Sequence, residues 1–400
     1  MTGSRRPRSH VDDLRGAGRL AVEATRGVTA LVEAMHATIA SGPAILGQPL
    51  AGPARIATGL VYGTVRGVTG LVGVGVDRAL AQLAPLLGAS APGFERDAIL
   101  AALNGVLGDY LLETSNPLAI EMGLRHAGEP RGKLLVLVHG SSMSDRQWTQ
   151  GGHDHGAALA RDLGYTPIYL HYNSGLHIST NGRAFADQLE GLVAAWPVPI
   201  DDLVLLGHSM GGMVARSACH AGADHAWRRH LRTLITVGSP HHGAPLERGG
   251  NVIDLLLSVS RYSAPLARLG KIRSAGVTDL RHGNVVDEHW HGRDRFEHRP
   301  DDRSPLALPA GVRCYAIAGT LSAEPAPRLR SDGLVPVDSA LGAHPTPALT
   351  LEFPQEHRSI VYGTGHLQLL GSAAVYELLR TWLSRPGSSP TPEHDVDRSP

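Results

Sequence analysis

The sequence predicts an α/β fold with a doubly wound, mostly parallel sheet that follows a helical N-terminal extension. Two observations carry this prediction. Between residues 118 and 384, apolar runs of strand length alternate with segments of helical spacing, which is typical of successive βαβ units. Runs such as Lys133 to Val138 are apolar after their first residue, as expected for strands of a sheet covered by helices on both faces.

The composition narrows the class of protein and of partner. Of the 400 residues 42% are hydrophobic, enough for one large domain with an appendage. Lys plus Arg and Asp plus Glu number 37 each, so no overall field favours nucleic acid, and we expect no such partner. Cys219 and Cys314 form no disulfide framework, which favours a reducing, cytoplasmic location. The sequence leaves the oligomeric state open.

Residues 11–110 differ in composition from the rest of the chain, and we expect a helical extension there after a disordered basic start at 1–10. RGVTALV at 26–32 returns as RGVTGLV at 66–72, an offset of 66 minus 26, or 40 residues. No continuous apolar run follows the basic start, so we expect no cleaved signal peptide, and Arg66 argues against a membrane span at 56–76. The helices either pack on the following domain or, over residues 11–100, contact a lipid surface or a partner peripherally.

The pattern predicts each element of a catalytic domain at 118–384, with an inserted lid at about 246–309 and a disordered, Pro/Ser-rich tail at 385–400. The lid is either a mobile cap or a fixed insertion that shapes the pocket. Strands are expected at 118–126, 133–138, 167–171, 203–206, 231–237, 312–318 and 349–353, and helices at 153–163, 182–196, 213–220 and 366–383.

The segment GHSMGG at 207–212 stands between an apolar strand and the start of a helix. A serine flanked by glycines at such a junction is typical of a nucleophile elbow, a turn so tight that only glycine fits on either side. We therefore predict that Ser209 is a nucleophile.

An activated serine needs a histidine base and an acid that orients it, in the chain order serine, acid, histidine. Asp332 in SDGLVP and His366 in GTGHL fit this order, and both follow predicted strands, where open α/β sheets bind ligands. The competitors Asp338 and His357 lie in less clear turns. We predict Asp332 and His366 as the partners of the serine.

Acyl transfer builds negative charge on a carbonyl oxygen, which backbone N–H groups must meet. We expect one donor from Met210, directly after the nucleophile, and the other from Ser141 or Ser142, in the loop after the strand at 133–138. His139, at the start of that loop, is expected to hold it in place.

The loop GSPHHG at 238–243 leaves the next strand at the same edge of the sheet. We expect His208, His241 and His242 to line the substrate pocket. Two adjacent histidines without a third ligand do not suggest a metal site, and the predicted chemistry needs neither metal nor cofactor.

The segments VLVHG at 136–140, GHSMGG at 207–212, GSPHHG at 238–243 and SDGLVP at 331–336 together resemble the α/β-hydrolase superfamily, most closely its bacterial lipase-like and deacylase-like serine esterases. The resemblance covers about residues 118–384. It implies hydrolysis of carboxylic esters through an acyl-enzyme on Ser209, with Asp332 and His366.

The expected function is that of a serine hydrolase acting on a small-molecule ester or a lipid. A thioesterase or an acyltransferase on the same triad is one alternative. The other is a protein of lipid surfaces in which the hydrolase role is secondary. The sequence leaves acyl-chain length open.

Overall fold

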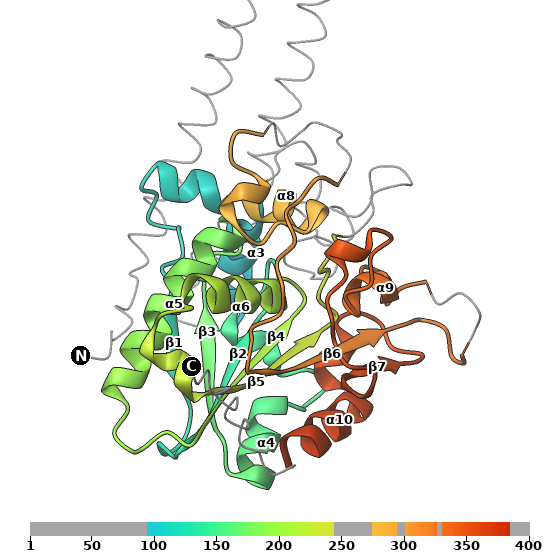
Figure 1. Ribbon diagram of the computed structural model, residues 1–400. Helices are drawn as coiled ribbons and strands as arrows, with labels where there is room; N and C mark the ends of the chain where they lie inside the picture. Colours follow the sequence, from blue (N-terminus) through green and yellow to red (C-terminus); the bar gives the residue numbers. More distant parts are fainter. Residues whose placement is uncertain (1–93, 244–273, 294–300, 326–329, 385–400) are drawn as a thin grey trace, which may run out of the picture.

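The computed structural model describes residues 94–243, 274–293, 301–325 and 330–384 (Figure 1). The expected helices before residue 94, with their repeat, most of the expected lid and the tail at 385–400 lie outside these residues. The described chain builds one seven-stranded sheet in the order β1-β3-β2-β4-β5-β6-β7. β1 pairs with β3 antiparallel and every other pairing is parallel, which confirms the predicted fold class.

The strands and helices alternate along the chain as the sequence predicts. The strands are β1 Gly123–His126, β2 Lys133–Val138, β3 Thr166–His171, β4 Asp202–His208, β5 Leu231–Val237, β6 Arg313–Gly319 and β7 Arg358–Val361. The helices are α3 Phe94–Glu113, α4 His155–Leu163, α5 Ile178–Ala195, α6 Met210–Ala221, α8 Ala275–His282, α9 Val337–Ala340 and α10 Ala373–Ser384. Short 3-10 turns lie at Asp145–Trp148, Ala226–His230, Asp287–His289, Pro347–Leu349, Gln355–His357 and Gln368–Gly371.

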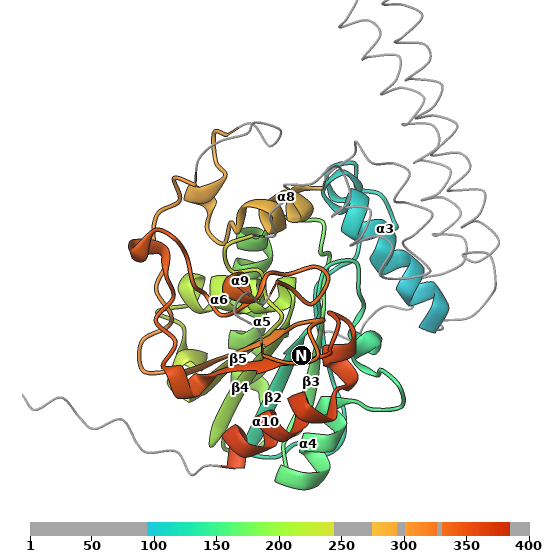
Figure 2. The ribbon, with the colours of Figure 1, turned by 90° about the vertical axis from the view of Figure 1, so that its right-hand side faces the viewer.

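Helices cover both faces of the sheet, α5 and α6 on one and α4 and α10 on the other (Figure 2). Along β2, Leu134 and Val136 face the core formed with α5 and α6, whereas Leu135 and Leu137 face the core formed with α4 and α10. Successive strand residues point to opposite faces, so two covered faces require an unbroken apolar strand. Every residue of β2 after Lys133 is indeed buried.

The predicted strand at 349–353 is wrong. This segment follows a 3-10 turn and pairs with no strand, although Leu349, Leu351 and Phe353 are all buried. The buried residues alternate along this segment because it packs against the core on the α6 side of the sheet, and not because it pairs with a strand. The last strand is instead β7 (RSIV). It pairs with β6, and Arg358 of β7 lies opposite Ala316 of β6. At the other edge, the strand predicted at 118–126 is limited to Gly123–His126.

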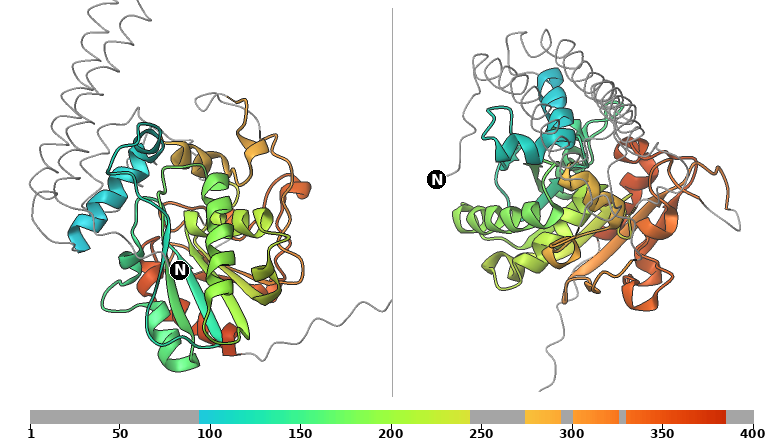
Figure 3. Two further views of the ribbon diagram at one scale, coloured as in Figure 1. Left: turned by 90° about the vertical axis from the view of Figure 1, so that its left-hand side faces the viewer. Right: turned by 90° about the horizontal axis from the view of Figure 1, so that it is seen from above.

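Helix α3 packs on the α/β domain beside α8 (Figure 3). The side chain of Asn104 donates to the carbonyl oxygen of Leu118 (2.8 Å) and accepts from the amide of Ile120 (2.8 Å), which fixes the chain that enters β1. A Cβ on Gly105 would lie 2.0 Å from the Ser142 hydroxyl, so only glycine permits this approach. Among the described residues, no helix is long and apolar enough to cross a bilayer.

Candidate active site

Ser209 occupies the sharp turn between β4 and α6. Its backbone angles are φ 54° and ψ −126°, a region that non-glycine residues adopt at a cost of about 1–3 kcal/mol. The glycines around it allow the close approach: a Cβ on Gly207 would lie 2.4 Å from the Gly212 backbone, and one on Gly211 would lie 2.0 Å from the carbonyl oxygen of Val138. The Ser209 side chain forms no capping hydrogen bond with α6. The turn therefore presents a serine hydroxyl that its own helix does not use.

Asp332 and His366 form a buried pair. The Asp332 Oδ2 and His366 Nδ1 atoms lie 2.7 Å apart, with exposed side-chain fractions of 1% and 6%. The other carboxylate oxygen, Oδ1, accepts hydrogen bonds from the amides of Leu334 (2.9 Å) and Val335 (2.8 Å). The His366 amide donates to the carbonyl oxygen of Asp332 (2.9 Å), so the two loops are tied together by backbone as well as by side chain.

These residues gather at the carboxyl ends of neighbouring strands, beside Ser209. The Ser209 amide donates to the carbonyl oxygen of Val237, the last residue of β5 (2.8 Å). A Cβ on the next residue, Gly238, would lie 3.3 Å from both Asp332 Oδ2 and His366 Cε1. His208, which precedes the serine, donates through Nε2 to the carbonyl oxygen of His366 (3.1 Å), and the two rings are 4.8 Å apart.

The competitors predicted for the base and the acid lie elsewhere. His357 precedes β7 and so lies at the opposite end of that strand from His366. Its Nδ1 donates to the carbonyl oxygen of Cys314 (3.1 Å), near the start of β6. Asp338 is exposed in the short helix α9.

The predicted oxyanion donors differ in availability. Met210 is the first residue of α6, where a backbone N–H has no acceptor within the helix. The Ser142 amide already donates to the Ser174 hydroxyl (2.9 Å), and Ser142 has a positive φ of 58°. Of the two residues proposed from this loop, Ser141 is therefore the one whose amide remains for a ligand. Ser174 was not predicted as a partner of this loop. Its position just after β3 could have indicated that it lies at this edge of the sheet.

His139 anchors the oxyanion loop, as expected for a structural residue. Its ring stacks on Tyr172 at 4.3 Å, and the Tyr172 hydroxyl donates to the His139 carbonyl oxygen (2.8 Å). Burial lowers the pKa of His139 to about 3, so the ring is neutral at neutral pH. Burial, together with His366, also lowers the pKa of His208 well below its usual value.

The hydrogen bonds of His241 and His242 lie away from the Asp332–His366 pair. His241 Nδ1 accepts from Arg216 (3.2 Å), and His242 Nε2 donates to the carbonyl oxygen of Gly342 (3.0 Å). Both rings line a second pocket, described below. Across the part of the chain that the structure describes, no three His, Cys, Asp or Glu side chains are grouped to hold a metal ion.

Comparison with known proteins finds a family model that is similar to part of this domain. Residues 129–304, less than half of the 400 residues, match the model described as the PGAP1-like alpha/beta domain. The match includes the strands β2 to β5 of the mostly parallel sheet. Over 92 residues, the chain is 34% identical to the GPI inositol-deacylase of Debaryomyces hansenii, a stretch that covers 20% of this chain and only 9% of that protein.

Solved structures similar to this α/β-hydrolase domain include two bacterial enzymes. The mature lipase BlEst2 of Bacillus licheniformis is 18% identical with a TM-score of 0.42, over 66% of this chain and 98% of that one. The esterase RhEst1 of Rhodococcus sp. ECU1013 is also 18% identical, with a TM-score of 0.39, over 66% of this chain and 95% of that one.

Proposed function

We propose that the α/β-hydrolase domain cleaves carboxylic esters through an acyl-enzyme on Ser209. The observation that carries this proposal is the buried Asp332–His366 pair, joined at 2.7 Å, beside a serine held at a strained strand-to-helix turn. A base, its orienting acid and a nucleophile on adjacent strand ends are the groups that acyl transfer requires.

The proposed reaction gives each of these groups a defined part. His366 accepts the proton as the Ser209 hydroxyl attacks the ester carbonyl, and Asp332 holds the imidazole with Nε2 toward the serine and stabilises the imidazolium. The amides of Met210 and Ser141 meet the negative charge on the carbonyl oxygen. His366 then protonates the leaving alcohol and activates the water that releases the acid, so no cofactor is needed.

We further propose that the substrate is an acyl ester of a lipid. The match of residues 129–304 to the PGAP1-like domain and the identity with a GPI inositol-deacylase support this class over small soluble esters. A series of p-nitrophenyl esters of increasing chain length, followed by acylated phospholipids, tests it. Turnover that falls steadily with chain length would contradict a lipid substrate.

Replacement of the nucleophile tests the reaction itself. We expect Ser209→Ala to remove p-nitrophenyl ester hydrolysis and labelling by a fluorophosphonate probe, with the circular dichroism spectrum unchanged. Ser217→Ala is the matched control, because Ser217 is also buried in α6 but lies two turns beyond the elbow. Hydrolysis or labelling that survives in Ser209→Ala would overturn the proposal.

Product analysis separates hydrolysis from the related acyl transfers. With an added alcohol acceptor, a hydrolase releases mainly free acid, whereas an acyltransferase forms mainly the new ester. A thioester substrate of the same acyl chain, assayed in parallel, identifies a thioesterase.

A further inference from the structure

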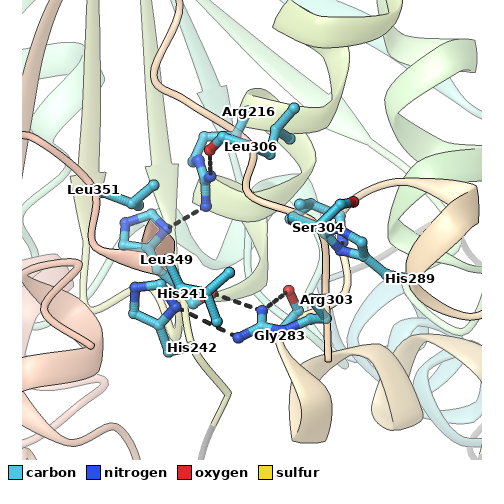
Figure 4. A pocket seen from close by; sticks show the side chains of 11 residues that line it. Arg216, His241, His242, Gly283, His289, Arg303, Ser304, Leu306, Leu349 and Leu351 are labelled. Atoms are coloured by element: carbon cyan, nitrogen blue, oxygen red, sulfur yellow. Dashed lines mark hydrogen bonds between the residues drawn. The ribbon is translucent and has the colours of Figure 1, made fainter. Parts of the chain in front are cut away.

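A pocket lies beside α6, the helix that follows Ser209, and is separate from the Asp332–His366 pair. It lies between α6, the loop after β5, the chain after α8 and the chain at 301–306 and is partly open to solvent (Figure 4). Two guanidinium groups and three imidazole rings line it, namely Arg216, Arg303, His241, His242 and His289. Leucine side chains complete the wall.

Arg216 is buried beside this pocket, and no carboxylate of the described residues pairs with it. The residue is 4% exposed, and it donates to the carbonyl oxygen of Leu306 (2.8 Å) and to His241 Nδ1 (3.2 Å). Its Nε atom is buried and has no hydrogen-bond partner among the residues that the structure describes. Among the residues that the structure describes, Arg216 forms no ion pair, whereas Arg303 of the same pocket does. An uncompensated buried charge costs several kcal/mol, so an anion bound at Arg216 would be stabilising.

The second guanidinium is already neutralised. Arg303 pairs with Asp301 at 2.6 Å and also donates to the carbonyl oxygens of Gly283 and His241. Among the described residues at this pocket, Asp301 therefore neutralises Arg303, and the charge of Arg216 remains in excess. Figure 4 shows the Arg216 and Arg303 side chains at the two histidines of the loop after β5.

The imidazole rings add hydrogen-bonding atoms to the pocket and not charge. Burial lowers the pKa of His242 and of His289 to about 4, and burial with Arg216 holds that of His241 well below its usual value. Burial also lowers the pKa of Arg216 to about 10, with Arg303 acting in the same direction. Arg216 is therefore still protonated at neutral pH, and the net charge of the pocket stays positive.

We propose that this pocket binds a small phosphate-type oxyanion that pairs with Arg216. A guanidinium presents N–H groups in a planar fork that matches the oxygens of a phosphate, and the free Nε belongs to that fork. The anion is either a free ion or the headgroup of a larger ligand. Nothing in the proposed ester hydrolysis requires this site, so the two proposals can fail separately.

Thermal unfolding of the full chain in inorganic phosphate tests the site. At constant ionic strength, maintained with sodium chloride, we expect the unfolding temperature to rise with the logarithm of phosphate concentration above Kd, by about 5 °C at 100 times Kd. An equal response to chloride and phosphate would overturn the proposal. Isothermal titration with phosphate gives Kd independently of unfolding.

Two variants and a matched control locate the response. Arg216→Met should weaken phosphate binding at least tenfold. Ser304→Glu replaces an exposed residue that lines the pocket, so we expect the variant to fold. The introduced carboxylate should weaken phosphate binding to a similar extent. Arg228→Met is the control, because Nε and Nη1 of Arg228 are also buried without a described partner, but its guanidinium lies 5.5 Å from the Trp227 ring, outside the pocket. Phosphate binding that survives both pocket variants, or that falls equally in the control, would refute the site.

Vesicles distinguish a headgroup from a free ion. Phosphatidylcholine vesicles with and without phosphatidic acid are sedimented with the wild type and with Arg216→Met. Binding to phosphatidic acid that depends on Arg216 and is displaced by inorganic phosphate assigns the site to a headgroup. Inorganic phosphate binding without such sedimentation assigns it to a free anion, and the loss of both excludes the site.

Discussion

Asp332 uses its two carboxylate oxygens for different purposes. Oδ1 accepts two backbone amides of its own turn, and Oδ2 is left for His366 Nδ1. The first pair of bonds fixes the carboxylate, so the second fixes the imidazole. This division separates the structural contribution of the residue from its proposed role in the reaction.

Asp332→Asn tests this division at the residue scale. The amide oxygen can keep the bonds from Leu334 and Val335, but the amide nitrogen then faces His366 and favours the wrong tautomer. We expect kcat for p-nitrophenyl esters to fall about ten-thousandfold, with little change in thermal stability. Asp338→Asn, at an exposed position in α9, should leave both quantities unchanged. A fall of less than tenfold in Asp332→Asn would contradict the assignment.

At the scale of elements, the strands that are buried on both faces could be predicted and the edges of the sheet could not. β2 has the predicted bounds because all its residues after Lys133 are apolar, and β5 (LRTLITV) also has the predicted bounds although Arg232 and two threonines interrupt its apolar residues. β7 is partly exposed and only four residues long, so its sequence RSIV carries no comparable signal. Asp332 follows β6 as predicted, whereas His366 follows β7 and not the strand predicted at 349–353. The hydrogen bond that occupies the Ser142 amide could not, because its acceptor is 32 residues away.

Helix α3 provides a test of how one element supports the proposed site. Gly105→Ala would place a Cβ 2.0 Å from the Ser142 hydroxyl and 2.9 Å from its Cα, so the oxyanion loop must shift. We expect a loss of about 1–3 kcal/mol in unfolding free energy and a lower kcat.

Gly191→Ala is the matched control for Gly105→Ala. It replaces another helical glycine, in α5, whose added Cβ would meet no atom within 4 Å. This variant should gain about 0.5–1 kcal/mol and keep its activity. Urea unfolding and steady-state kinetics measure both effects, and equal stability changes in the two variants would contradict the contact.

At the scale of the whole molecule, buried neutral histidines couple stability to pH. Burial lowers the pKa of His139 to about 3 and that of His155 and His289 to about 4. In the unfolded chain these groups titrate near 6.5. Between these pKa values the unfolded chain binds more protons than the folded protein, so stability is present above about pH 6.5 and falls as the pH falls toward 4.

The expected slope can be measured by urea unfolding between pH 7 and pH 4.5. Each such histidine contributes up to about 1.4 kcal/mol per pH unit within its window. His155→Gln should reduce the slope by about one such contribution. His126→Gln, at an exposed position, should leave it unchanged. A flat profile would show that the buried rings are protonated in the folded state.

The contact between Gly105 and Ser142 connects α3 to the loop that follows β2. The first 93 residues are continuous with this helix, and the helix touches the loop that supplies one proposed oxyanion amide. A displacement of α3 would therefore reach the loop of Ser141 and Ser142 through Gly105, with no change needed in the sheet. If Ser141 supplies the proposed oxyanion amide, the position of α3 sets the rate of the proposed reaction.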